Sequence, residues 1–266
     1  MARRAVGSNQ YKARLVSTAV HGPDDDLLQQ AQQDTKRYTC RQIWSTRCDQ
    51  EVQFPAFRCP KHPSHHIPAA RCPAPVLLQL ARSDDMPTRD AVAKHRHTPP
   101  QLLDMLTRDK HQLVRANAAC NPRCPANALR ELVHDPQTMV RSAVAKHPKC
   151  PEDILRRLAE DSSPAVRLMV AANRKCPPEV LVAMYTSVDN AVIATIAGNP
   201  RCPTETLAHL AQHPFSLARI NLARNPNTPT EAIRQLLQDP MEGVRRRAQQ
   251  HPNCPEEYRG LAQISR

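Results

Sequence analysis

The sequence is poor in glycine and in aromatic residues. Among 266 residues it has 5 glycines, and aromatic residues make up 3%. It contains neither a glycine-rich phosphate loop nor a dinucleotide fingerprint, and most nucleotide-dependent enzymes use one of these motifs. A zinc-protease helix motif and a nucleophile elbow are also absent from the sequence. No set of residues therefore predicts catalysis, and we expect a protein that is not an enzyme.

The sequence also lacks long apolar runs. No stretch approaches the roughly 18 apolar residues that a membrane-spanning helix needs. Residues 1–20 carry basic side chains without the apolar core of a signal peptide. We therefore expect a cytoplasmic chain with no membrane partner. Because the cytoplasm is reducing, the 10 cysteines predict metal ligands or buried thiols instead of disulfides.

Proline is abundant, and many of the prolines recur at a fixed step. Of the 26 prolines, eight follow a cysteine or threonine at positions that are 26 residues apart. The positions are Cys72, Thr98, Cys124, Cys150, Cys176, Cys202, Thr228 and Cys254. They define seven complete repeats and a truncated eighth that ends at Arg266. Because threonine replaces cysteine in two repeats, we expect small buried side chains at these positions within the solenoid.

Each repeat has the sequence pattern of two short helices. Proline at the first helical position, followed by a pair such as Leu103 and Leu106, predicts the first helix. A pair such as Val140 and Val144 predicts the second helix, which ends at an Asn or His that we expect to bond nearby backbone groups. Helices of about ten residues are not stable alone. The repeats must therefore stack into an all-α solenoid.

The net charge of +12 predicts an acidic partner. Six repeats place an arginine at the same position, namely Arg89, Arg115, Arg141, Arg167, Arg219 and Arg245. Such a row either contacts an anionic partner or joins the repeats by bonding an Asp or a carbonyl of the neighbouring repeat. Because an Asp precedes the arginine by six residues in four repeats, we favour the second interpretation. The fifth repeat has Ile193 instead, and Arg246 and Arg247 are better candidates for partner contact.

Residues 1–71 lie outside the repeats and predict a separate N-terminal domain, followed by the repeat solenoid over residues 72–266. Asp24 to Asp26 and the leucines after them predict one helix that runs toward Tyr38. Four cysteines follow at Cys40, Cys48, Cys59 and Cys72. Four thiolates hold Zn²⁺ or an iron–sulfur cluster, and the short C-x2–4-C spacing of zinc sites is absent. The residues alone leave a cluster, zinc and unliganded thiols open.

The repeats resemble the leucine-rich repeat variant family. The pattern that carries the resemblance is Cys-Pro-x-x-x-Leu-x-x-Leu-Ala, then Asp-Pro-x-x-x-Val-Arg-x-x-Val-Ala, then Asn/His-Pro, from Cys72 to Arg266. The resemblance implies a right-handed superhelix of alternating α and short 3₁₀ or α helices, without the strands of ordinary leucine-rich repeats. The second half of each repeat is also similar to HEAT repeats.

The resemblance further implies a cofactor in the N-terminal segment. Members of this family carry four N-terminal cysteines that bind a [4Fe-4S] cluster, and the four cysteines named above are similar in number and position. Zinc is the alternative. Cys72 also occupies the first position of a repeat, so His62, His65 or His66 is the alternative fourth ligand.

Three functions fit these features. The first is a rigid basic scaffold that binds an acidic protein partner, with the cluster as a structural cap or as a redox or iron sensor. The second is binding to nucleic acid. It would involve the nucleic-acid backbone alone, because few aromatic residues in the repeats could stack on bases, namely Tyr185, Phe215 and Tyr258. The third is electron transfer. We favour the first because repeat solenoids present extended recognition surfaces, and the sequence does not predict the oligomeric state.

Overall fold

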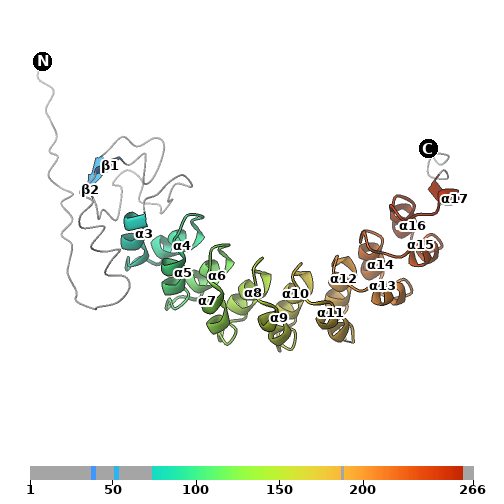
Figure 1. Ribbon diagram of the computed structural model, residues 1–266, viewed down its shortest axis with the longest axis horizontal. Coiled ribbons are helices and arrows are strands. Elements are labelled where there is room, and N and C mark those ends of the chain that lie inside the picture. The colour runs from blue at the N-terminus through green and yellow to red at the C-terminus, as the bar shows by residue number, and fades with distance from the viewer. Residues whose placement is uncertain (1–36, 40–50, 54–73, 187–188, 260–266) are drawn as a thin grey trace, which may run out of the picture. The chain divides into compact units, whose positions relative to one another are not determined.

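The computed structural model describes residues 37–39, 51–53, 74–186 and 189–259 (Figure 1). The chain divides into two compact units, Met1–Ala128 and Leu129–Arg266. The predicted domain boundary after residue 71 lies outside the described residues and stays a prediction.

Two short strands precede the repeats. Strand β1 (Arg37–Thr39) pairs antiparallel with β2 (Glu51–Gln53), and Tyr38 lies opposite Val52. These strands are not predicted from the sequence, because three residues are too few for an alternating apolar pattern to be recognised. The helix predicted to run from Asp24 toward Tyr38 lies outside the described residues, and Tyr38 itself lies in β1.

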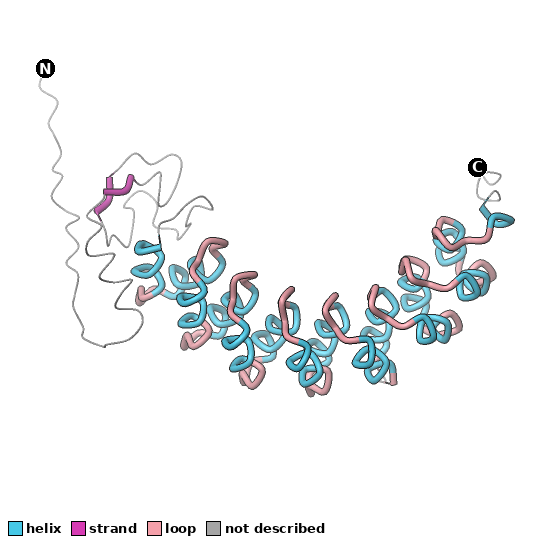
Figure 2. Tube along the Cα trace, viewed as in Figure 1, coloured by secondary structure: helices cyan, strands magenta, loops and turns pink. Residues whose placement is uncertain are grey.

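The repeats confirm the all-α prediction (Figure 2). The first helices of the repeats are α3 (Ala74–Ala81), α5 (Pro100–Leu106), α7 (Ala126–Leu132), α9 (Glu152–Leu158), α11 (Pro178–Tyr185), α13 (Thr204–Leu210), α15 (Thr230–Leu236) and α17 (Glu256–Arg259). The second helices are α4 (Met86–Lys94), α6 (Gln112–Cys120), α8 (Thr138–Lys146), α10 (Pro164–Ala172), α12 (Asn190–Gly198), α14 (Ser216–Leu222) and α16 (Glu242–Gln249). Within each unit these helices stack in series, as a solenoid requires.

The first helices start one residue later than predicted. Pro151, Pro177 and Pro203 are N-caps with extended backbones, so the helix begins after each of these prolines. The cysteine or threonine before the proline packs inside the repeat, and Thr98 Oγ1 donates to Val92 O at 2.7 Å. The predicted apolar ladder is confirmed, because Leu103, Leu129, Leu155, Leu181, Leu207 and Ile233 are all fully buried. Burial of this ladder supplies the apolar stabilisation that the short helices lack alone.

The second helices are α-helices with tightened ends. At the start of α8 the Val140 N–H donates to Gln137 O at 3.0 Å, and at its end the His147 N–H donates to Val144 O at 3.1 Å. Both are bonds between residues three apart, the 3₁₀ type that commonly tightens helix ends. The α alternative of the prediction therefore holds for the second helix, with 3₁₀-type bonds confined to its ends.

The second helices pack more closely on one another than the first helices do. In the C-terminal unit, α8 packs on α10, α10 on α12, and α12 on α14. The close approach of α12 and α14 includes Gly198, whose α-carbon faces the side chain of Asn221. Within this unit the second helices therefore line the inner edge of a curved row and the first helices line its outer edge (Figure 1).

Candidate functional site

The arginine that recurs at one position of the repeats joins neighbouring repeats at Arg89, Arg141 and Arg219, as the structural interpretation predicts. In the C-terminal unit, Arg141 bonds Asp161 of the next repeat with Nε at 2.7 Å and Nη2 at 3.0 Å. Its Nη1 donates to Asp135 O, six residues earlier, at 2.9 Å. The same arrangement joins Arg219 to Asp239 and, in the N-terminal unit, Arg89 to Asp109. These guanidiniums are already occupied and offer little to a partner.

The ion pair changes the acidity of its carboxylate. Hydrogen bonds from Arg141 lower the pKa of Asp161, and they outweigh burial, which raises it. The Asp161 side chain is 8% exposed, so both partners are removed from water. A buried carboxylate needs such a partner, because desolvation of an unpaired charge is costly.

The arginine row is interrupted at Ile193, and the aspartate expected 20 residues later is also replaced. The fifth repeat lacks the aspartate as well, since it has Ser187, but there Arg167 is kept and lies 3.9 Å from Asp189. Ile193 replaces the arginine in the fifth repeat, and His213 replaces the aspartate of the sixth repeat. His213 Nδ1 accepts the Phe215 N–H at 3.2 Å, which is the local role that Asp161 Oδ1 has for the Ser163 N–H at 2.9 Å. Ile193 is buried. With no guanidinium to receive, the sixth repeat needs no carboxylate.

A second row, of asparagines, also joins the repeats. Asn199 Nδ2 donates to two carbonyls of the preceding repeat, Ala171 O at 2.6 Å and Asn173 O at 3.1 Å. Its Oδ1 accepts the Arg201 N–H at 2.9 Å, which is the local bond that the sequence predicts. Equivalent bonds are made by Asn121, Asn173 and Asn225. The prediction of purely local bonds is thus incomplete, because these side chains also cross between repeats.

The predicted ligands Cys40, Cys48, Cys59 and Cys72 and the alternatives His62, His65 and His66 all lie outside the described residues. The cysteines at the first position of the described repeats are buried, namely Cys124, Cys150, Cys176, Cys202 and Cys254, whereas Cys120 at the end of α6 is exposed. Burial raises the pKa of the first four of these to about 12, so they remain thiols at neutral pH. No cluster of metal-ligating side chains occurs in the part of the chain that the structure describes.

From α8 to α14, the inner face of the C-terminal unit is formed by helices without carboxylates, whereas α16 carries Glu242. Helices α8, α10, α12 and α14 contain no Asp or Glu. Large apolar side chains lie exposed on them, with Met139 at 43% and Leu217 at 44% exposed. Leu168, Met169 and Ile220 are half-buried neighbours on α10 and α14. We call these five residues the apolar strip.

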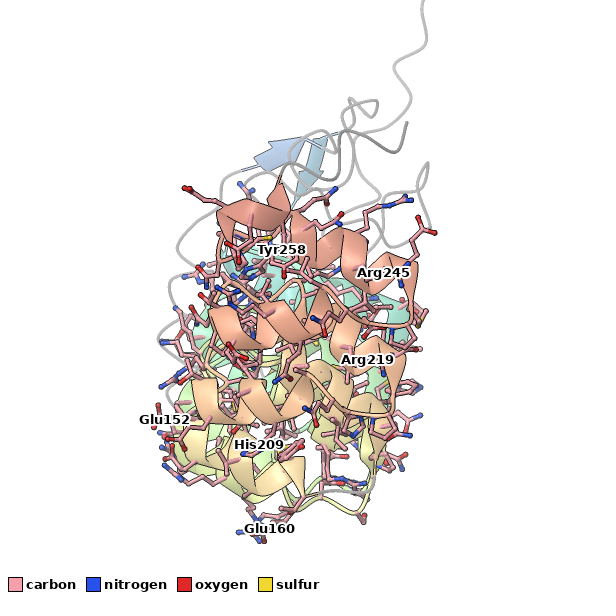
Figure 3. The ribbon with its side chains drawn as sticks, turned by 90° about the vertical axis from the view of Figure 1, so that its right-hand side faces the viewer. Glu152, Glu160, His209, Arg219, Arg245 and Tyr258 are labelled. Atoms are coloured by element: carbon pink, nitrogen blue, oxygen red, sulfur yellow. The ribbon has the colours of Figure 1, made fainter. Side chains whose placement is uncertain are left out.

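Cations border the apolar strip at the C-terminal ends of the same helices. This basic border consists of Lys146, Lys149, Arg174, Lys175, Arg201 and Arg224. Arg201 is half-buried and the other five are exposed. The side chains of these five exposed residues form no bond with the described part of the chain. Arg201 donates to Lys175 O at 3.0 Å and lies 3.7 Å from Glu152. In the end-on view, Arg219 and Arg245 of the arginine row lie on the side opposite Glu152 (Figure 3).

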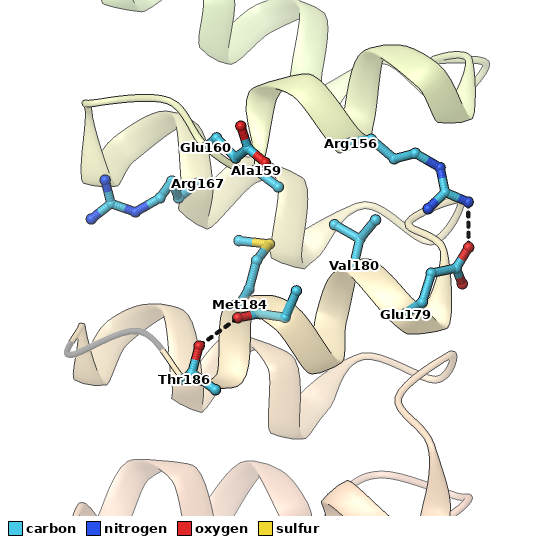
Figure 4. Close-up of a pocket in the computed structure, with 9 residues that line it drawn as sticks. Arg156, Ala159, Glu160, Arg167, Glu179, Val180, Met184 and Thr186 are labelled. Atoms are coloured by element: carbon cyan, nitrogen blue, oxygen red, sulfur yellow. Dashed lines mark hydrogen bonds and ion pairs between the residues drawn. The ribbon is translucent and has the colours of Figure 1, made fainter.

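The outer edge of the C-terminal unit has mixed charge. A cavity of about 520 Å³ opens between α9 and α11, lined by Val180 and Met184. The ion pair between Arg156 and Glu179 lies at one side of it, and Glu160 lies across from that pair (Figure 4). Because both signs of charge line this cavity, it selects for neither an anion nor a cation.

The basic border is not among the predictions from the sequence, and Arg246 is less available for partner contact than predicted. The signal for the border is present in the sequence, since Lys or Arg occurs at the closing positions of successive repeats. Arg246, predicted to be available for contact, forms an exposed ion pair with Glu242 at 2.5 Å. Arg247 is exposed and lies outside the row.

No helix among the described residues is long and apolar enough to cross a bilayer. No curated protein matches the chain in sequence.

Comparison with known families and structures points to one type of repeat. Residues 218–241 match the family model described as leucine rich repeat variant. A solved structure, titled a leucine-rich repeat variant with a novel repetitive protein structural motif, is similar at 27% identity and a TM-score of 0.50, over 68% of this chain and 72% of that one. A designed armadillo repeat protein is similar at 16% identity and a TM-score of 0.34, over 66% and 97%. The family match and the first of these structures support a repeat scaffold of the leucine rich repeat variant type.

Proposed function

We propose that the chain is a binding scaffold whose C-terminal unit holds an acidic segment of a partner protein on its inner face. One observation carries this proposal. Four successive inner helices contain no carboxylate, while the basic border beside them has five exposed cations without partners among the described residues. A potential of one sign along a surface attracts a partner of the opposite sign and suppresses others.

The composition of the same face favours protein over nucleic acid. Single-stranded nucleic acid is usually held by aromatic side chains on which its bases stack. The inner helices α8, α10, α12 and α14 contain no aromatic residue. Apolar aliphatic side chains occupy the face instead, and these suit a polypeptide.

Reversing charges on the basic border tests the proposal. We expect the triple variant Lys149→Glu, Arg174→Glu and Lys175→Glu to bind fluorescent poly-L-glutamate at least tenfold more weakly in anisotropy titrations at physiological salt. The reason is that contacts with cations are replaced by repulsion. The circular dichroism spectrum should be unchanged, because the three side chains are exposed and form no bond with other described residues.

A matched control separates the border from net charge. The triple variant Arg130→Glu, Arg157→Glu and Arg234→Glu makes the same change in charge, from +12 to +6, on the outer helices. It should keep affinity for poly-L-glutamate within about threefold, since exposed pairs on that side contribute little. Equal losses in both variants, or tighter binding to duplex DNA than to poly-L-glutamate, would contradict the proposal.

We also propose that Cys40, Cys48, Cys59 and Cys72 bind a [4Fe-4S] cluster that caps the first repeat. Two observations support this. The cysteines at the first position of the described repeats are accounted for without metal, as buried thiols. The pairing of Thr39 with Glu51 joins the two ends of the stretch that carries Cys40 and Cys48, and four thiolates are the donor set that such clusters use. The cluster would supply structural cross-linking or redox sensing. The cytoplasmic location of the protein remains a prediction.

Cluster binding has a direct spectroscopic test. Anaerobically purified protein should be brown, with broad visible absorption and about four iron atoms per chain, and Cys40→Ala should lose both. Cys254→Ala is the control, because that buried thiol belongs to a repeat. Loss of iron in Cys72→Ala would identify Cys72 as the fourth ligand, whereas loss in His62→Ala, His65→Ala or His66→Ala alone would transfer that role. A colourless protein with one zinc ion would contradict the proposal.

A further inference from the structure

We infer that the segment bound on the inner face presents large apolar side chains together with its acidic ones, and that the apolar strip receives them. This inference rests on the proposed function and names the chemistry of the partner more closely. An acidic partner that paired with the basic border alone would not account for the exposure of the apolar strip, namely Met139, Leu168, Met169, Leu217 and Ile220.

The exposure of the strip is unusual within the molecule. Among the described residues, four large apolar side chains are markedly exposed, namely Met139, Val182, Leu217 and Met241. Met139 and Leu217 occupy the same position in the third and sixth repeats, on inner helices α8 and α14. Between them, α10 contributes Leu168 and Met169, whereas α12 has the small Ala191 at the position of Met139, so the large apolar side chains lie on the third, fourth and sixth repeats.

Charge decides what kind of molecule fits this face. No carboxylate lies on α8, α10, α12 or α14, and the basic border follows their C-terminal ends. An acidic ligand without apolar groups would pair with the border and leave the strip exposed to water. A nucleic acid backbone has no apolar side chains to offer, and a flat bilayer would meet the outer edge of the curved row before the inner edge (Figure 1). A polypeptide with both acidic and apolar residues matches both features.

The length of the strip limits the length of the segment. Stacked helices are about 8–10 Å apart, so the three steps from α8 to α14 span roughly 24–30 Å. An extended chain advances at most about 3.3–3.6 Å per residue. A segment of about seven to nine residues therefore reaches from Met139 to Leu217.

Selection from random peptides tests the inference without a known partner. Twelve-residue peptides displayed on phage would be selected on the immobilised full-length protein. We expect the recovered sequences to be enriched both in Asp or Glu and in Leu, Ile, Met or Phe. A synthetic peptide of the consensus should then bind at least tenfold more weakly to the double variant Met139→Ser and Leu217→Ser.

Val182 provides the matched control. It is 43% exposed, like Met139, but lies on outer helix α11, so Val182→Ser should leave the affinity for the peptide unchanged. Recovery of acidic peptides without apolar enrichment, bound equally by the Ser variants, would overturn the apolar inference and leave the proposed acidic partner standing. Recovery of neutral or basic peptides would overturn both.

Discussion

Replacing Asn199 by alanine is expected to destabilise the stack by about 2–3 kcal/mol, because two buried carbonyls lose a hydrogen-bond donor. In the folded chain, the Asn199 amide donates to Ala171 O and Asn173 O of the preceding repeat, and its oxygen accepts the Arg201 N–H. Asn199 is 3% exposed, so water cannot readily replace these bonds. The free energy of unfolding, measured by urea titration with circular dichroism, should fall by this amount.

The position of the loss is as informative as its size. Repeat stacks gain stability from nearest-neighbour interfaces, so amide hydrogen exchange should accelerate first in α10 and α12, on either side of the missing bonds. Asn190→Ala is the control, because Asn190 is exposed at the start of the same helix and should cost less than 0.5 kcal/mol. Equal destabilisation by the two substitutions would show that Asn199 does not join the repeats.

The sequence predicts the repeat architecture well because each repeat solves the same packing problem. Leu103 and its equivalents recur at helical spacing, and the structure buries all of them. The ends of the first helices are predicted less well. Proline is compatible both with the first helical position and with an extended cap, so the sequence alone does not separate the two.

The contacts between repeats are the part that sequence reasoning captures incompletely. An Asp six residues before an Arg suggests that the two are partners, yet the carboxylate of Asp161 bonds Arg141, which lies 20 residues earlier. Ile193 replaces the arginine and His213, 20 residues later, replaces the aspartate, and this paired replacement carries the information in the sequence. The asparagine row has no such signal, because its partners are backbone carbonyls that every residue possesses.

The inner face illustrates a different limit. Each cation of the basic border is visible in the sequence, but its meaning depends on which side of each helix remains exposed. Acidic residues are frequent in the same repeats, as in Glu152 and Glu179, and they lie at the starts of the first helices. Only the folded arrangement shows that the four helices without carboxylates, α8, α10, α12 and α14, pack side by side on one face.

Removing one partner of the half-buried ion pair between Arg141 and Asp161 should cause the largest loss of stability. Arg141→Ile is expected to cost about 3–5 kcal/mol, because it leaves the Asp161 side chain, which is 8% exposed, charged without its partner. Adding Asp161→His reproduces the pair that the chain itself uses at Ile193 and His213, and should recover at least half of the loss. Urea unfolding of wild type, both single variants and the double variant completes the double-mutant cycle. Additive effects in this cycle would contradict a direct coupling of the two side chains.

The pH dependence of the same variants separates charge from shape. The pKa of Asp161 is lowered in the folded chain, so its contribution to stability is fully present above the unfolded value of about 3.9. It is lost as the pH falls through the lower folded value, where the folded carboxylate takes up a proton. Between pH 4 and pH 2, wild type should therefore lose more stability than the double variant, whose imidazole is protonated throughout this range. Parallel curves over this range would show that Asp161 contributes through its shape, and that burial has cancelled the benefit of its charge.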